Sequence, residues 1–118
     1  ISFSKIEKNF NSNTFNYENI FKNKCLSDEF FQDNSKMFDA IYIDGYHHGA
    51  QVYKDCINSW KFLKNNGFLI CDDYIWRFYS NFRDNPCYAI NVFLSKIVGT
   101  YKLEKVSNSQ IFIKKIID

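Results

Sequence analysis

The fold is decided by the stretch Asp39-Ala40-Ile41-Tyr42-Ile43-Asp44-Gly45-Tyr46-His47, in which an apolar run stops abruptly on polar residues. Residues 40–43 are mostly β-branched or aromatic, which predicts a strand buried on both faces. Gly45 permits a sharp turn after this strand. Ligands of open parallel sheets bind outside the carboxyl ends of the strands, so we expect Asp44 and His47 to lie at a functional site.

A second stretch repeats this pattern, because the apolar run 67–71 stops on Asp72 and Asp73. Between the two runs, apolar residues recur at helical spacing over 49–65, namely at Val52, Cys56, Trp60 and Leu63. A strand, helix and strand in this order predict parallel strands over 39–44 and 67–72, whose carboxyl ends share one edge of the sheet. Neighbouring strands lie about 4.8 Å apart, so Asp44, Asp72 and Asp73 would crowd together.

The rest of the chain predicts further elements of a single α/β domain over residues 1–118. We expect a short helix near 4–11, a short strand around Ile20 and Phe21, and a helical turn that Ser27 or Asp28 caps. Residues 65–67 supply left-handed residues to end the helix 49–65. Another helix begins at Asn85 and Pro86, and the alternating segments 101–106 and 110–117 predict a terminal antiparallel hairpin joined by 107–109.

The composition excludes several classes of protein. With 46% hydrophobic and 19% aromatic residues the chain is not disordered, and a net charge of +2 gives no argument for a nucleic-acid or membrane-surface partner. No apolar run approaches the length of a membrane span and no signal-peptide pattern opens the chain, so we expect a cytoplasmic protein. The four cysteines form no Cys-x-x-Cys pair, which favours free thiols in a reducing compartment.

The residues at the sheet edge leave more than one chemistry open. An acidic pair can cap a turn, but three crowded carboxylates favour a hard divalent cation such as Mg²⁺. His47, three residues after Asp44, would then be a general base beside a metal ligand, whereas His48 is expected to face solvent or to cap the following helix. The aromatic loop 74–82 is either a lid over the core or the wall of an acceptor pocket.

These residues together resemble a known family. The stretch 38–47, the helix with Tyr53 and Asp55, the run 60–67 and the stretch 69–74 resemble the C-terminal part of class I S-adenosylmethionine-dependent methyltransferases. Within that class they are most similar to small-molecule O-methyltransferases of the macrocin and mycinamicin type. The resemblance covers about residues 25–115, and it implies a Rossmann-like methyltransferase sheet.

The resemblance also implies site residues and ligands. Asp44, Asp72 and Asp73 would hold Mg²⁺ while His47 takes the proton of the acceptor hydroxyl. Ser27 and Asp28 would lie near the adenine of S-adenosylmethionine. The substrate is expected to be a small-molecule acceptor, with Tyr74 and Trp76 beside it.

One feature departs from the family. The four glycines, Gly45, Gly49, Gly67 and Gly99, form no Gly-x-Gly pattern, so we expect that the glycine-rich half of the cofactor site is missing. The apolar surface thereby uncovered would favour self-association into a homo-oligomer. A metal-dependent hydrolase and a non-catalytic interaction module derived from a nucleotide-binding fold remain as alternatives.

Overall fold

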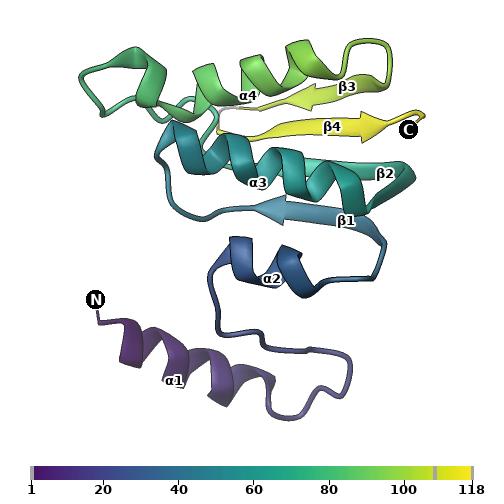
Figure 1. The fold of residues 1–118 in the computed structure, drawn as a ribbon. Helices are drawn as coiled ribbons and strands as arrows, with labels where there is room; N and C mark the ends of the chain where they lie inside the picture. The colour runs from purple at the N-terminus through teal and green to yellow at the C-terminus, as the bar shows by residue number, and fades with distance from the viewer. Residues whose placement is uncertain (1, 108, 118) are drawn as a thin grey trace.

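The computed structural model describes residues 2–107 and 109–117. Their elements are α1 (Phe3–Thr14), α2 (Ser27–Asp33), β1 (Phe38–Ile43), α3 (Gly49–Phe62), β2 (Leu63–Cys71), a 3₁₀ turn η1 (Phe82–Asp84), α4 (Pro86–Lys96), β3 (Tyr101–Val106) and β4 (Ile111–Lys115). The strands form one sheet in the order β1-β2-β4-β3, with α3 and α4 in front of it (Figure 1). No helix in these ranges is both long and apolar enough to cross a membrane.

The predicted parallel pair and the predicted hairpin are both present. β1 pairs with β2 in parallel, with Ile41 opposite Leu69 and Ile43 opposite Cys71. β4 pairs antiparallel with β2 and with β3, so the hairpin adds the antiparallel edge. Residue 108 of the expected hairpin turn lies outside the described residues. The fold class expected from the sequence is therefore confirmed.

The end of α3 lies three residues earlier than the helical spacing predicts. Lys115 of β4 donates its Nζ to the carbonyl oxygens of Trp60 and Leu63, at 2.8 and 2.9 Å. The carbonyl oxygen of Trp60 also accepts from the backbone amide of Leu63, so Lys115 adds a charged donor to the last turn of α3. The chain becomes extended at Leu63, so β2 begins there and not at residue 67. Asn66 does adopt the expected left-handed conformation, with φ 68°, but within β2.

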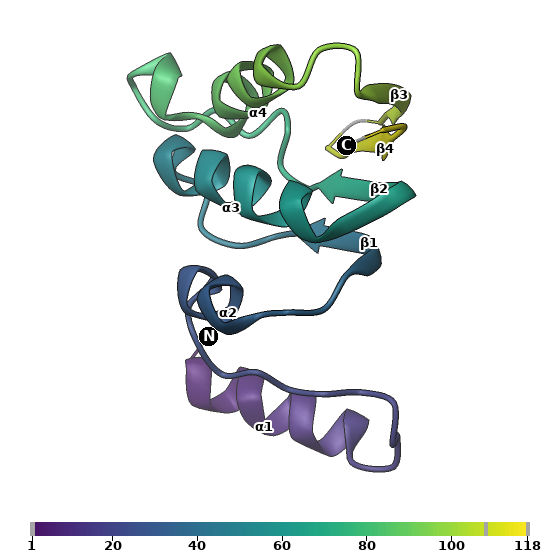
Figure 2. The same ribbon diagram turned by 45° about the vertical axis from the view of Figure 1, so that its right-hand side comes forward.

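Only one face of β1 packs against the core, and its side chains there are half-buried, which corrects the prediction of a strand buried on both faces. Ile41 and Ile43 pack against the core that α3 and α4 build with β2 and β4. Because successive side chains of a strand alternate between its faces, Tyr42 points the other way, and it is 49% exposed. Figure 2 shows α3 and α4 on the same side of the sheet.

The N-terminal part differs from the prediction in three places. α1 is longer than residues 4–11, and it contacts no other helix or strand of the described part. No strand forms around Ile20 and Phe21, where both side chains are exposed and no neighbouring strand offers hydrogen bonds. Neither Ser27 nor Asp28 caps α2, because Leu26 occupies the N-cap position and makes no side-chain cap.

The helix expected at residues 85 and 86 is α4. Asn85 is the N-cap residue of α4, yet its side chain bonds the backbone of Tyr79 instead.

All four cysteines are free thiols, but only Cys56 and Cys71 are buried, whereas Cys25 is exposed and Cys87 is half-buried. Cys56 and Cys71 are fully buried free thiols in the core, with their Sγ atoms 3.9 Å apart. Burial of these thiols confirms that they pack as core residues.

Replacing Gly67 with alanine should destabilise the sheet. A Cβ atom there would lie 2.7 Å from the carbonyl oxygen of Asp39 and 2.8 Å from that of Lys64, and neither backbone oxygen can move freely. We expect Gly67→Ala to lower the free energy of unfolding by about 1–3 kcal/mol, as overpacking does. Urea titration of the full-length protein measures this, and Asn65→Ala, an exposed change in the same strand, should stay within about 0.5 kcal/mol of wild type. Equal midpoints for the two variants would contradict the steric argument.

Candidate functional site

The carboxyl ends of β1 and β2 bring three carboxylates together. The parallel ladder continues one residue beyond β2, because the amide of Asp72 donates to the carbonyl oxygen of Ile43 at 2.9 Å. Asp44 follows Ile43 directly, so the side chains of Asp44 and Asp72 leave the sheet at the same level. Side-chain oxygens of Asp44, Asp72 and Asp73 all lie within 4.8 Å of one another. The crowding expected from the sequence is present.

A turn in the backbone lets both Asp72 and Asp73 take part. Consecutive residues of a strand point to opposite faces, so two adjacent aspartates meet one site only where the strand has ended. β2 ends at Cys71, and Asp73 adopts a left-handed conformation with φ 59°. The amide of Trp76 donates to the carbonyl oxygen of Asp73 at 2.9 Å and closes this turn. Aspartate is one of the few non-glycine residues that enter this region readily.

The cluster is electrostatically unfavourable without a cation or a proton. Partial burial raises the pKa of Asp44, and the neighbouring carboxylates of Asp72 and Asp73 raise it further. Burial and then the charge of Asp72 also raise the pKa of Tyr42, whose hydroxyl accepts a hydrogen bond from Gln110 at 2.9 Å. Three oxygen donors at this spacing fit a hard divalent cation. Tyr42 was missed in the sequence, although its position two residues before Asp44 places it on the same face.

His47 lies beside the carboxylates in a defined orientation. Its Nε2 is 2.7 Å from Oδ2 of Asp73, and its ring stacks on Trp76 with centroids 4.7 Å apart and planes 4° from parallel. When Nε2–H donates to Asp73, Nδ1 carries the lone pair and can accept a proton. His48 instead caps α3 by accepting from the amide of Ala50 at 3.2 Å, which confirms the capping role predicted for it.

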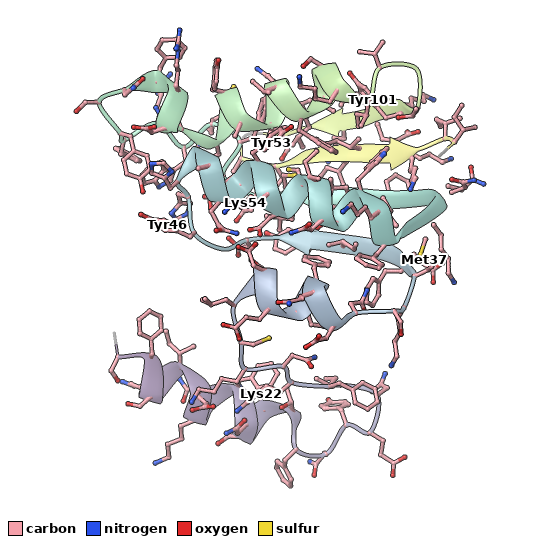
Figure 3. The ribbon with its side chains drawn as sticks, in the orientation of Figure 1. Lys22, Met37, Tyr46, Tyr53, Lys54 and Tyr101 are labelled. Atoms are coloured by element: carbon pink, nitrogen blue, oxygen red, sulfur yellow. The ribbon has the colours of Figure 1, made fainter. Side chains whose placement is uncertain are left out.

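Ser27 and Asp28 lie on a cleft that opens beside Asp44. The cleft has a volume of about 540 Å³, and Gly45 and Tyr46 also line it. Figure 3 shows Tyr46 on the loop between β1 and α3. The chain bends at Gly45, as predicted, but without a positive φ, and an added Cβ would meet Oδ2 of Asp55 only at 4.0 Å. The cleft thus joins the expected cofactor residues to the carboxylate cluster.

Two residues of α3 on this cleft were missed as site residues. Asp55 is buried, and with Gln51 it bonds residues at the start of α2. They lie four residues apart, so one helical turn places them on one face. That spacing was the available sequence signal, but it does not identify their partners on another element.

Tyr74 and Trp76, both on the aromatic loop 74–82, line a second pocket of about 450 Å³. The hydroxyl of Tyr74 donates to Oδ1 of Asn91 at 2.8 Å, and its backbone amide donates to Ser109. Burial raises the pKa of this tyrosine. Of the two alternatives for the loop, the geometry favours a pocket wall, and Trp76 connects that wall to His47.

The comparisons with known proteins identify the fold as a methyltransferase-type α/β sheet. A family model described as a methyltransferase domain matches residues 5–74, which is more than half of the chain, so the chain belongs to this family. The match begins nearer the N-terminus than residue 25, where the resemblance in sequence was expected to start. No curated protein matches the chain.

Solved structures support the same fold. The O-methyltransferase NovP is 16% identical with a TM-score of 0.64, covering 99% of this chain and 46% of its own. A caffeoyl-CoA O-methyltransferase candidate from Staphylococcus aureus is 20% identical with a TM-score of 0.61, covering 97% and 61%. The O-methyltransferase from Bacillus cereus in complex with SAH is 14% identical with a TM-score of 0.52, covering 75% and 45%. The chain thus spans roughly half of the length of these structures.

Asp44→Asn should weaken binding of a divalent cation. The substitution replaces a charged oxygen ligand with a neutral amide of the same shape. Removing a residue that only supports a metal ligand already lowers metal affinity about tenfold, so we expect a loss of at least that size here. Isothermal titration of the full-length protein with Mg²⁺ measures this. Asp39→Asn is the matched control, because Asp39 is an exposed carboxylate near the other end of β1 that pairs with Lys64 at 3.5 Å. Equal Mg²⁺ affinity in the Asp44 variant and wild type would exclude Asp44 as a ligand.

Proposed function

We propose that the protein containing this chain transfers a methyl group from S-adenosylmethionine to a hydroxyl group of a small molecule or sugar, with Mg²⁺ assisting. The observation that carries this proposal is the meeting of Asp44, Asp72, Asp73 and His47 at the carboxyl edge of a sheet from the methyltransferase-domain family. Each of these groups has the chemistry that such a transfer requires.

Asp44, Asp72 and Asp73 would hold the cation. Their oxygen atoms lie close enough to share one ion, and carboxylates are preferred ligands of Mg²⁺. When bound, Mg²⁺ acts as a Lewis acid that lowers the pKa of a hydroxyl group. Asp73 uses only Oδ2 for His47, so its other oxygen is available to the cluster.

His47 is proposed as the general base. Its contact with Asp73 orients the ring and fixes the tautomer that leaves Nδ1 free, while the stacked Trp76 prevents the ring from rotating away. The half-buried imidazole would accept the proton from the acceptor hydroxyl as its oxygen attacks the methyl group of the sulfonium. A base held in this way needs no rearrangement before proton transfer.

The two pockets fit the two substrates of the reaction. Ser27 and Asp28 would contact the adenosyl part of the methyl donor in the cleft that reaches Asp44, and the O-methyltransferase from Bacillus cereus is itself a complex with SAH. The acceptor would enter the pocket lined by Tyr74 and Trp76, whose walls are mostly aromatic or apolar. All three structural neighbours carry the name O-methyltransferase, which supports a hydroxyl acceptor.

The setting of the reaction is part of the proposal. A net charge of +2 supports a small-molecule acceptor over nucleic acid or a membrane surface. The free thiols of Cys56 and Cys71 suit the reducing environment of the cytoplasm. The exposed face of the sheet at Tyr42 leaves room for a homo-oligomer.

His47→Ala tests the base. In the full-length enzyme we expect turnover to fall by about 10² to 10⁴ fold, the usual contribution of a general base. Affinities for Mg²⁺ and S-adenosylmethionine should stay near those of wild type, since the carboxylates and the cleft are kept. His48→Ala is the matched control, because this ring caps α3, and it should lower stability more than turnover. Full activity of His47→Ala across the pH range would exclude His47 as the base.

Removal of the metal and titration of the cofactor test the rest of the proposal. EDTA should abolish methyl transfer, and added Mg²⁺ should restore it. Activity unchanged by EDTA would show that the carboxylates do not form a required metal site. A hydrolase or a non-catalytic module should bind no S-adenosylmethionine, so isothermal titration of the wild type separates these alternatives from a methyltransferase.

A further inference from the structure

A buried carboxylate on α3 bonds the start of α2 across the cofactor cleft. The hydroxyl of Ser27 donates to Oδ1 of Asp55 at 2.7 Å, and Nε2 of Gln51 donates to the same oxygen at 3.0 Å. Nε2 of Gln51 also lies 3.1 Å from Oδ1 of Asp28. Asp55 is only 6% exposed. A single oxygen atom of Asp55 therefore fixes Ser27 directly and Asp28 through Gln51.

α2 has few other means of holding its first turn in place. It has seven residues, none of them buried, and its N-cap position makes no side-chain hydrogen bond. Its other links are aromatic and lie further along, where Phe31 stacks on Phe62 with centroids 5.9 Å apart and Phe30 contacts Phe38. A helix this short is not stable by itself. The position of Ser27 and Asp28 therefore depends on the bonds to Asp55 and Gln51.

The same side of α3 carries polar atoms for which no hydrogen bond is found among the described residues. Oδ2 of Asp55 lies on the side of Gly45, 4.0 Å from the position a Cβ would take there. One turn further along α3, Ser59 is fully buried, lines the same cleft, and its Oγ has no hydrogen-bond partner among the described residues. A buried hydroxyl without a partner is rare and points to a ligand or water that satisfies it. The α3 wall of the cleft is thus shaped for an occupant.

We propose that Asp55 is a positioning residue for the cofactor, an inference that rests on the methyl-transfer function proposed above. It keeps Ser27 and Asp28 in their binding positions before the cofactor arrives. The only proton of the Ser27 hydroxyl is donated to Asp55, so Ser27 offers the cofactor an acceptor oxygen and its backbone, and no hydroxyl donor. A wall ordered in advance binds more tightly because its ordering cost is met during folding.

The first measurement tests whether Asp55 holds the start of α2 in place, in the full-length protein without cofactor. Asp55→Ala removes both bonds to Oδ1, and we expect amide hydrogen exchange over residues 26–33 to become about tenfold faster or more. Asp55→Asn keeps an oxygen that can accept from Ser27 and should exchange at close to the wild-type rate. Asn58→Ala is the matched control, since Asn58 lies on the same helix outside this cleft. Unchanged exchange in Asp55→Ala would overturn the proposal.

The second measurement follows the cofactor. By titration with S-adenosylmethionine, Asp55→Ala should raise the Kd about tenfold or more, while kcat at saturating cofactor stays within about threefold of wild type. Asp55→Asn should restore most of the affinity. The double variant Ser27→Ala/Asp55→Ala should lose less affinity than the sum of the two single losses, because both changes remove the bond between Ser27 and Asp55.

The outcomes separate this inference from the proposed function. A merely structural role would lower kcat, affinity and Tm together, and that result would overturn the positioning role. Wild-type affinity in Asp55→Ala, with a wild type that binds the cofactor, would overturn the inference and leave the proposed function intact. A wild type that binds no S-adenosylmethionine would overturn the proposed function and the cofactor role of Asp55 with it. Should Asp55→Ala fail to fold, Ser27→Ala must by itself speed amide exchange over residues 26–33 in the protein without cofactor, where no cofactor contact contributes, and unchanged exchange there would overturn the proposal.

Discussion

The parallel pairing of β1 and β2 is the constraint on which the site depends. Because α3 returns the chain to the start of the next strand, both strands run the same way and end at the same edge. The bond from the amide of Asp72 to the carbonyl oxygen of Ile43, at 2.9 Å, holds the two ends level. A slip of the register by one residue would turn Ile41 and Ile43 away from the core and carry Asp44 to the other face. Burial of the core side chains therefore also fixes where the carboxylates stand.

The parts of the fold that the sequence predicted are those that local patterns decide. The strands, the crossover helix, the hairpin and the meeting of three carboxylates follow from residue spacing and from turns within a few positions. The end of α3 could not be predicted in this way, because Lys115, which closes it, lies 52 positions beyond Leu63. The strand expected at Ile20 and Phe21 also depends on distant residues. The β propensity is present there, but no neighbouring strand pairs with this segment.

The candidate site shows the same division between local and distant information. The spacing of Asp44 and His47 along one loop was sufficient to place both near the carboxyl edge. The contact of His47 with Asp73 was not predictable, since it needs the left-handed turn at Asp73 and the stacked ring of Trp76. The role of Ser27 was likewise misjudged as a helix cap, because its partner Asp55 lies 28 positions away on another helix. Side-chain partners on separate elements are the information that a single sequence lacks.

Asp73 connects the two halves of the proposed chemistry. One of its oxygens orients His47, and its carboxylate also belongs to the cluster that would hold the cation. A change at Asp73 therefore disturbs the base and the metal ligands at once, whereas Asp44 makes no such contact with the imidazole among the hydrogen bonds of the described residues. The two aspartates are not equivalent although both lie in one cluster. Changing Asp73 and changing His47 each remove the contact between them. If the base and the cation act in one step, the effects of the two changes on methyl transfer must therefore be less than additive. The effects of changing Asp44 and His47 should remain closer to independent.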